Sequence, residues 1–370
     1  MSHLKIFESL GLPSSPVFLA PLAGVSDHPY RRVCSRVGAD LTYVEMISAT
    51  ALLYESQRTY DMLARHASEA CLGVQITGPD ADQVGRAVAI LNAMPFDTID
   101  INMGCPVKKV VKTGCGSAIL RDPERVMATV RAARNATDKP LSAKIRLGWD
   151  QASRNAVEVA QAIEEGGAHW LTVHGRTRAD DYGEPVDLEG IRLVKQAVSI
   201  PVIGNGNLFA HADVQAMQAL TGVDGVMISR GALGNPWLFR EIKSGDARVT
   251  VDAWEELILL HLDWQRDAYG EQPGAAVCMR KHLLWYAKGW PGVRTFRDAV
   301  NQAADLPAAR ELIKDFAAQL RAHGITHRLP LVQSDTSQRF AWDPKFDMDR
   351  QLDRGVGDEA MDRLPEMIFT

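Results

Sequence analysis

The sequence predicts an α/β fold, a (β/α)8 TIM barrel followed by a C-terminal all-helical domain. Eight short apolar runs alternate with helix-period segments, and their starts lie 23 to 44 residues apart, as one strand and one helix per unit require. The first run is not followed by the glycine fingerprint of a doubly wound sheet. After Arg240 the strand signals stop and only helical periodicity continues.

The expected strands are short and rich in β-branched residues. They span Val17–Ala20, Leu41–Val44, Leu72–Ile76, Thr98–Asn102, Ser142–Arg146, Trp170–His174, Val202–Asn205 and Gly225–Ile228. Most of these runs end on, or are followed by, a polar side chain. Because chemistry in such a barrel is located at the carboxyl ends of the strands, these side chains are expected to converge on one mouth.

The chain divides into three expected parts: a catalytic barrel over 1–245, a helical domain over 246–328 and an acidic extension over 329–370. Helices of the second part are expected at Trp254–Trp264, Ala275–Lys288, Thr295–Ala303 and Pro307–His323. The extension holds nine acidic and five basic residues and is poorly periodic, so no packed structure is expected for it.

Composition is that of an ordinary globular protein, with 46% hydrophobic and 24% charged residues. It excludes collagen-like, coiled-coil and low-complexity chains. No apolar run reaches the roughly 18 residues that a membrane span needs, and no export signal begins the chain, so we expect a cytoplasmic protein with no membrane partner. Five cysteines, an odd number, indicate reduced thiols. No metal site and no protein partner are predicted.

The net charge of −5 would by itself count against a nucleic-acid partner. Without the extension, however, 36 basic residues face 37 acidic ones. Between Glu271 and Asp298 there is no acid at all. In this segment basic residues are interleaved with aromatic ones: the basic residues are Arg280, Lys281, Lys288, Arg294 and Arg297, and the aromatic residues are Trp285, Tyr286, Trp290 and Phe296. Cations neutralise phosphates, so the basic residues favour an RNA partner, whereas the aromatics are expected to be buried against the barrel.

Two glycine loops follow the seventh and eighth strands, at 204–207 and 229–234. In barrels these loops commonly build a phosphate site from released backbone N–H groups, and Arg230 adds charge there. Each loop alone is more typical of an ordinary turn. Their joint position favours the phosphate site.

Lys144 lies inside an apolar strand, where an unpaired ammonium is costly to bury. A flavin in a barrel mouth needs a donor near its N1 and C2 carbonyl, and a lysine meets that need. Gln75 could bind the polar edge of the ring, and His174 could bind that edge or a phosphate. The alternatives are a Schiff-base lysine, a snorkelling lysine and a core histidine.

Cys105 follows the fourth strand on a loop rich in glycine and lysine, and Pro106 comes directly after it. No histidine or acid lies beside it in sequence to remove its proton, so a neutral thiol there could act as a general acid. Cys115, in the same loop, is the competing candidate. The other three cysteines are expected to be structural.

Taken together, the segments 20–27, 102–106, 144–149 and 174–178 and the Gly206 loop resemble the tRNA-dihydrouridine synthase family from about Val17 to His323. The segments 107–110 and 280–282 resemble its bacterial B-type branch. This resemblance implies an oxidoreductase with an FMN-binding barrel and a helical tRNA-binding domain. Such an enzyme reduces the C5–C6 bond of a uridine in tRNA with electrons from NADPH or NADH.

The resemblance also implies roles for single residues. Cys105 would protonate C5 while hydride from the flavin reaches C6, and Asn102 would hold the uracil. FMN contacts would come from Pro21, Leu22, Ala23, Gln75, Lys144, His174, Asn205, Gly206, Asn207, Ser229 and Arg230. The tRNA would be bound by Arg176, Arg178, Arg280 and Lys281, with Lys108, Lys109 and Lys112 extending the positive field. Asn207 departs from the usual acid of the family, and Ser229 departs from the usual glycine.

Other functions remain open at this level. A free-pyrimidine reductase or a dihydroorotate-type dehydrogenase could use the same FMN barrel and loop cysteine. An aldolase could use Lys144, and an RNA-binding protein could carry an inactive barrel. The acid-free basic segment favours tRNA over a free base, because a free base needs no domain that follows phosphates.

Overall fold

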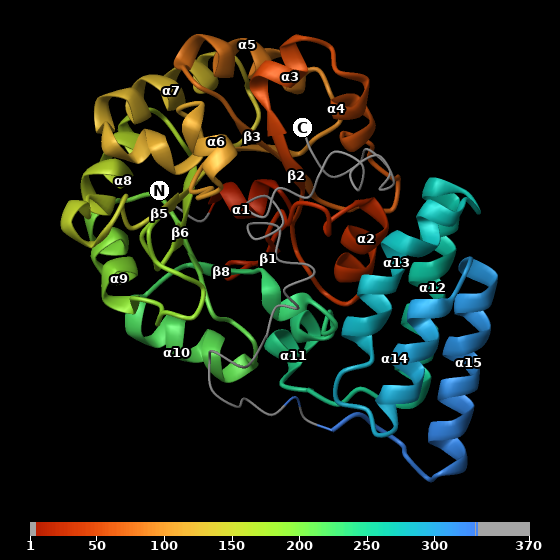
Figure 1. Cartoon of the computed structure of the whole chain (residues 1–370). Helices are drawn as coiled ribbons and strands as arrows, with labels where there is room; N and C mark the ends of the chain where they lie inside the picture. Colours follow the sequence, from red (N-terminus) through yellow and green to blue (C-terminus); the bar gives the residue numbers. More distant parts are fainter. Residues whose placement is uncertain (1–4, 330, 332–370) are drawn as a thin grey trace.

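The computed structural model describes residues 5–329 and 331, and its strands form one closed parallel barrel (Figure 1). The strands are β1 Val17–Leu19, β2 Thr42–Ser48, β3 Leu72–Thr77, β4 Thr98–Met103, β5 Leu141–Arg146, β6 Trp170–His174, β7 Val202–Asn205 and β8 Gly225–Ile228. Their order is β1-β8-β7-β6-β5-β4-β3-β2. A parallel bridge between Phe18 and Leu41 joins the two ends of the sheet. The predicted (β/α)8 barrel is confirmed.

The register brings the polar residues of neighbouring strands to the same level. Asn102 pairs with Lys144, and His174 pairs with both Arg146 and Asn205. Because all pairs are parallel, the carboxyl ends of the strands meet at one mouth, as the sequence predicts.

Helices cover the outside of the barrel. They are α2 His28–Arg36, α3 Ala49–Leu53, α4 Gln57–Met62, α5 Ala81–Asn92, α6 Lys108–Lys112, α7 Pro123–Asn135, α8 Ala156–Glu165, α9 Leu188–Ala197, α10 His211–Thr221 and α11 Leu238–Ser244, with 3-10 turns η1 Gly116–Arg121, η2 Gln151–Ser153 and η3 Arg230–Ala232. Asp27, Asp80, Asp122 and Asp187 each accept a backbone N–H at a helix start. Such caps fix where a chain turns from loop into helix.

The end of the barrel opposite the mouth is closed by aromatic side chains. Helix α1, Lys5–Ser9, inserts Phe7 against Phe18 and Trp170, with ring centroids 6.1 and 5.8 Å apart. All three rings are fully buried. Access to the interior is therefore from the carboxyl ends of the strands.

Four helices beyond the barrel have a core of their own (Figure 1, cyan to blue). They are α12 Val251–Tyr269, α13 Pro273–Tyr286, α14 Val293–Gln302 and α15 Leu306–Ala322. Trp254 lies at the centre, in edge contact with Trp290, Phe296 and Phe316. The predicted helical region is confirmed. Tyr286, Trp290 and Phe296 are buried, but in the core of the helical domain and not against the barrel as expected; Trp285, which is half-buried, does pack against the barrel core. The boundary at 245/246 stays a prediction, and the extension lies outside the described residues except for Leu329 and Leu331.

Among the described residues, no helix is both long and apolar enough to cross a membrane, and no three His, Cys, Asp or Glu side chains gather as metal ligands. All five cysteines fall within the described part of the chain, and none forms a disulfide.

Candidate active site

A buried hydrogen-bond chain lies below the mouth. The carboxylate of Asp100 accepts from Gln75 Nε2 at 2.7 Å and from Ser142 Oγ at 2.6 Å. Burial raises the pKa of Asp100 to about 6, while these two hydrogen bonds and nearby Lys144 oppose the shift. Asp100 was not among the predicted site residues, although alternation along a strand places it on the same face as Asn102.

Asn102 connects this chain to the loop that carries the cysteine. Its Nδ2 donates to Gln75 Oε1 at 2.8 Å, and its Oδ1 accepts from the backbone N–H groups of Gly104 and Cys105 at 3.2 and 2.9 Å. Arg146 holds the same loop from β5, because its Nε donates to Gly104 O at 3.0 Å. The start of the cysteine loop is therefore fixed by two side chains of the barrel.

The two loop cysteines differ in accessibility. Cys105 is half-buried at the mouth, within electrostatic range of the Lys144 ammonium. Cys115 is buried, with its Sγ 3.9 Å from Thr113 O, and burial raises the pKa of its thiol. The geometry favours Cys105 as the thiol that a ligand in the mouth can reach.

Five basic side chains gather at the mouth: Lys144, Arg146, His174, Arg176 and Arg230. Burial and then Arg146 lower the pKa of Lys144 to about 8. The pKa of His174 falls well below 6.5 because the ring is buried among the other four cations. The neutral ring accepts from Arg176 at Nε2, 3.2 Å away. A cluster with this surplus of positive charge suits an anionic ligand.

Asn207 lies between two of these cations. It has a positive φ of 49°, and its Oδ1 accepts from Arg176 and from Arg230, each at 3.2 Å. The amide orients both guanidinium groups but, being uncharged, does not neutralise them. Next to it, Asn205 Nδ2 donates to Ser229 Oγ at 3.1 Å, so the serine hydroxyl has a defined partner.

Tyr182 lies over the cation cluster. Its ring stacks on His174 with centroids 6.3 Å apart, and the Arg230 guanidinium lies 4.5 Å from the ring centroid. The tyrosine is 48% exposed, on the loop between β6 and α9. Sequence reasoning missed both Tyr182 and Arg146. Only Arg146 carried a signal, since it shares a strand face with Lys144.

Glycines near the end of β7 and after β8 are required by close packing. A Cβ on Gly204 would lie 2.4 Å from Met217 Sδ, and one on Gly231 would lie 2.0 Å from Leu208 O. Gly206 has a φ of 125°, a conformation that favours glycine. The positive charge of the mouth therefore comes from side chains, and backbone donation to a phosphate by these loops stays a prediction.

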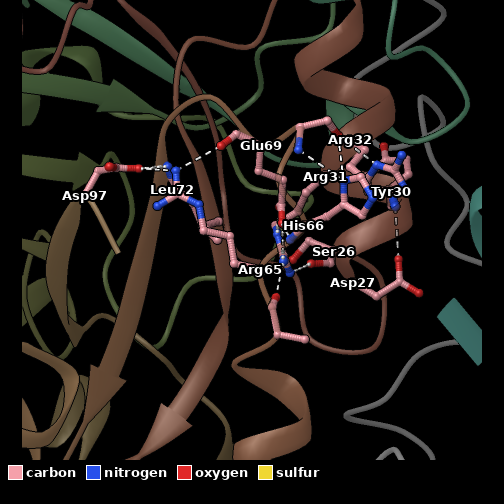
Figure 2. A network of polar contacts seen from close by, with 12 residues as sticks. Ser26, Asp27, Tyr30, Arg31, Arg32, Arg65, His66, Glu69, Leu72 and Asp97 are labelled. Carbon is pink, nitrogen blue, oxygen red and sulfur yellow. Dashed lines mark hydrogen bonds and ion pairs between the residues drawn. The ribbon is translucent and has the colours of Figure 1, made fainter. Parts of the chain in front are cut away.

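The loop after β1, which carries Pro21, Leu22 and Ala23, is braced from several sides. The backbone N–H of Leu22 donates to Ser26 Oγ at 2.8 Å. Behind the loop, Arg31 of α2 donates through one terminal nitrogen to Ser26 O at 3.2 Å (Figure 2).

The same arginine forms a buried ion pair with Glu69, with Arg31 Nε 2.6 Å from Glu69 Oε1 (Figure 2). Glu69 Oε2 also accepts from the backbone N–H of His66 at 2.9 Å. This pair therefore ties helix α2 and the end of the β1 loop to the segment that precedes β3.

The residues predicted to bind tRNA occupy different environments. Arg178 is half-buried, 4.5 Å above the Trp149 ring. Arg176 is only 1% exposed and donates to the carbonyls of Tyr182 and Glu184, so it holds the β6 loop and could reach RNA only if that loop opened.

On α13, Arg280 donates to Ala303 O at 2.6 Å, and Lys281 donates to Gly24 O. Lys108, Lys109 and Lys112 are exposed on α6. The lysines of α6 are thus exposed, whereas Arg280 and Lys281 are engaged in contacts within the protein.

Comparison with known proteins agrees with this geometry. A family model described as dihydrouridine synthase matches residues 18–321. The tRNA-dihydrouridine synthase B of Pseudomonas aeruginosa is 38% identical over 314 residues, covering 83% of this chain and 94% of that protein. A probable tRNA-dihydrouridine synthase of Rickettsia conorii is 36% identical, covering 82% and 93%. Among solved structures, a morphinone reductase aligns with a TM-score of 0.46 and 13% identity over 63% of this chain and 87% of its own, a likeness too distant to inform function.

Dihydrouridine is uridine reduced at its C5–C6 bond, so its synthases are oxidoreductases. The family model covers most of this chain, and the relatives are matched over nearly their whole length. The chain therefore belongs to the dihydrouridine synthase family and is an oxidoreductase.

Proposed function

We propose that this protein reduces uridine in tRNA to dihydrouridine, with FMN as its bound cofactor and NADPH or NADH as electron donor. The observation that carries the proposal is the half-buried Cys105 thiol beside a cation cluster at the mouth of a closed barrel. The names of the relatives support tRNA as the substrate. The proposal includes a cytoplasmic location, where tRNA is found.

The side chains at the mouth fit an FMN molecule. Arg230 and His174 suit its phosphate, and the Lys144 ammonium suits the ring edge that gains negative charge on reduction. Gln75 and Asn205 each carry an amide for the remaining polar edge or the ribityl chain, and Pro21, Leu22 and Ala23 line the β1 loop. When bound, the flavin supplies the hydride.

The residues of the chain supply the proton and the orientation. Cys105 holds its proton on Sγ at the open side of the mouth, where it can be given to C5 of the uracil. Asn102 and Arg146 hold the Gly104–Cys105 peptide directly before this thiol, which fixes the backbone from which Sγ projects. Asn102 Nδ2 has a second hydrogen that can bind the uracil.

A uridine inside folded RNA has to leave its stack to reach the mouth, which costs a few kcal/mol and favours unpaired loops. The exposed lysines of α6 and the half-buried Arg178 can contribute phosphate contacts that offset this cost. We propose that these residues, with the exposed cations Arg294 and Arg297 of α14, form the tRNA-binding surface.

Two measurements test the proposal together. Purified protein should bind FMN, and tRNA from cells lacking the protein should lose dihydrouridine at one or more sites when mapped nucleoside by nucleoside. Restoring the gene should restore those sites. A complete set of dihydrouridines in the deleted strain, or a protein that binds no flavin, would contradict the proposal.

The charge of Lys144 should make FMN binding depend on pH. Its pKa of about 8 leaves it charged below that pH and neutral above, so the dissociation constant of FMN should rise as pH passes 8. Lys144→Met should abolish this step and weaken binding at pH 7 by about 10- to 100-fold, the value of a charged hydrogen bond. Titration of flavin fluorescence from pH 6.5 to 9.5 would measure both.

Lys139 provides the matched control, because its pKa is also lowered by burial but it lies before β5, at the closed end of the barrel, where it donates to Phe96 O. Lys139→Met should leave the pH profile of FMN binding unchanged. An unchanged profile in Lys144→Met as well would show that Lys144 does not contact the cofactor.

A further inference from the structure

Helix α13 packs directly on loops at the mouth of the barrel. A Cβ on Gly234, in the loop after β8, would lie 2.3 Å from Trp285 O, so this loop touches the backbone of α13. At the other side, Lys281 of α13 donates to Gly24 O in the loop after β1. The helical domain therefore contacts two of the loops that the proposed function assigns to FMN binding.

The peptide groups around Gly24 are held by two domains at once. The Gly24 N–H donates to Glu45 Oε2 of β2 at 2.6 Å, while its C=O accepts from Lys281. Gly24 has a φ of 69°, in the left-handed region. A rearrangement of this turn would break contacts on both sides, so the two side chains together fix the backbone direction one residue after Pro21–Ala23.

Charged groups of both signs surround this turn, and burial, which outweighs the nearby cations, raises the pKa of Glu45 to about 7. Glu45 is half-buried, and Lys281 and Arg31 are the cations that lie near it, together with the acid Asp27 and the polar Tyr269 and Cys278. Tyr269 of α12 donates to Asp27 Oδ2 at 3.1 Å. The helical domain thus brings a cation and a hydroxyl group close to two carboxylates, Asp27 at the end of this loop and Glu45 on β2.

We propose that Lys281 is a positioning residue for the cofactor site: with Glu45 it fixes the Gly24 turn, so that the helical domain holds the β1 loop in its FMN-binding shape. This inference rests on the proposed function, and it gives Lys281 a role other than the RNA contact expected from the sequence. The side chain acts through the backbone at Gly24 and not on the flavin itself.

FMN affinity separates the two roles of Lys281. Lys281→Met should raise the dissociation constant of FMN about tenfold, since a charged hydrogen bond that orders the loop is lost. At saturating FMN, the visible spectrum of the bound flavin should also shift, because the loop no longer has one shape. Lys281→Arg, which keeps a donor, should restore most of the affinity and the spectrum.

Arg294 gives the matched control, because it is an exposed cation of the helical domain on α14. Arg294→Met should leave FMN affinity unchanged. Lys281→Met could instead leave the dissociation constant of FMN and the flavin spectrum unchanged, and lower the slope of log K against log salt concentration for tRNA binding by about one. In that case Lys281 is an RNA contact and the inference is wrong.

The failure of this inference differs from the failure of the proposed function. A wild-type protein that binds no FMN overturns the proposed function, whereas equal FMN binding by wild type and Lys281→Met overturns only the role of Lys281. If Lys281→Met does not fold, as judged by its melting temperature, Glu45→Gln replaces it. That variant should raise the FMN constant about threefold, because an amide accepts more weakly than a carboxylate; no change would overturn the inference.

Discussion

Cys105→Ala should lower the rate of uridine reduction by about 10²- to 10⁴-fold, the usual contribution of a positioned general acid. The affinities for FMN and tRNA should stay within about twofold of wild type, because the thiol is not expected to contribute a binding contact to either one. Single-turnover reduction of an unmodified tRNA transcript by the pre-reduced enzyme measures the loss. Flavin reduction by NADPH, followed separately, should be unaffected, since that step needs no thiol proton.

Cys115→Ala is the matched control, because Cys115 lies in the same loop but is buried against Thr113 O. It should retain most of the activity. Cys105→Ser should be nearly as slow as the alanine variant, since a hydroxyl is a far weaker acid than a thiol. Full activity in Cys105→Ala, or loss of activity in Cys115→Ala alone, would contradict the assignment of the acid.

Glu69→Ala should lower the free energy of unfolding by about 3–5 kcal/mol, because it leaves the Arg31 guanidinium buried and unpaired. Both residues are 1% exposed, and Glu69 meets Arg31 at 2.6 and 3.2 Å. Urea unfolding followed by circular dichroism measures the change. The loss of FMN affinity should follow, since Arg31 also holds Ser26 O at the end of the β1 loop.

An exposed ion pair shows how much of this effect comes from burial. Glu189 and Arg192 pair on α9 with 60% and 37% of their side chains exposed. Glu189→Ala should leave the free energy of unfolding nearly unchanged, because solvent screens an exposed pair. Equal effects of the two substitutions would show that the Arg31–Glu69 pair is not a buried, desolvated contact in solution.

Most of the fold was predictable because strand and helix periodicities are local. Strands β6, β7 and β8 match the predicted ranges at both ends, and each of the four helices after the barrel was expected. Strand β2 runs on to Ser48, beyond the predicted end at Val44, because its pairing with β3 shifts register between Val44 and Ile47. A register shift depends on the partner strand, so periodicity along one strand could not reveal it.

Part of the candidate site was also predictable. Strand ends on a closed barrel converge, so Gln75, Asn102, Lys144 and His174 could be placed at one mouth before any contact was known. The residues by themselves left Cys115 as a competitor to Cys105, because the path of the loop between them decides that Cys105 is half-buried and Cys115 buried.

The sequence by itself determined the order of the strands, the helical region, the chemistry of the mouth and the likeness to the family. The tertiary structure alone decided which cations face the mouth and which hold the protein together. Arg176 is buried under the β6 loop, and Lys281 lies on Gly24, more than 250 residues away in the chain. Whether a charged side chain contacts solvent or a carbonyl group depends on which distant segment packs against it. A local sequence pattern carries no information about that packing partner.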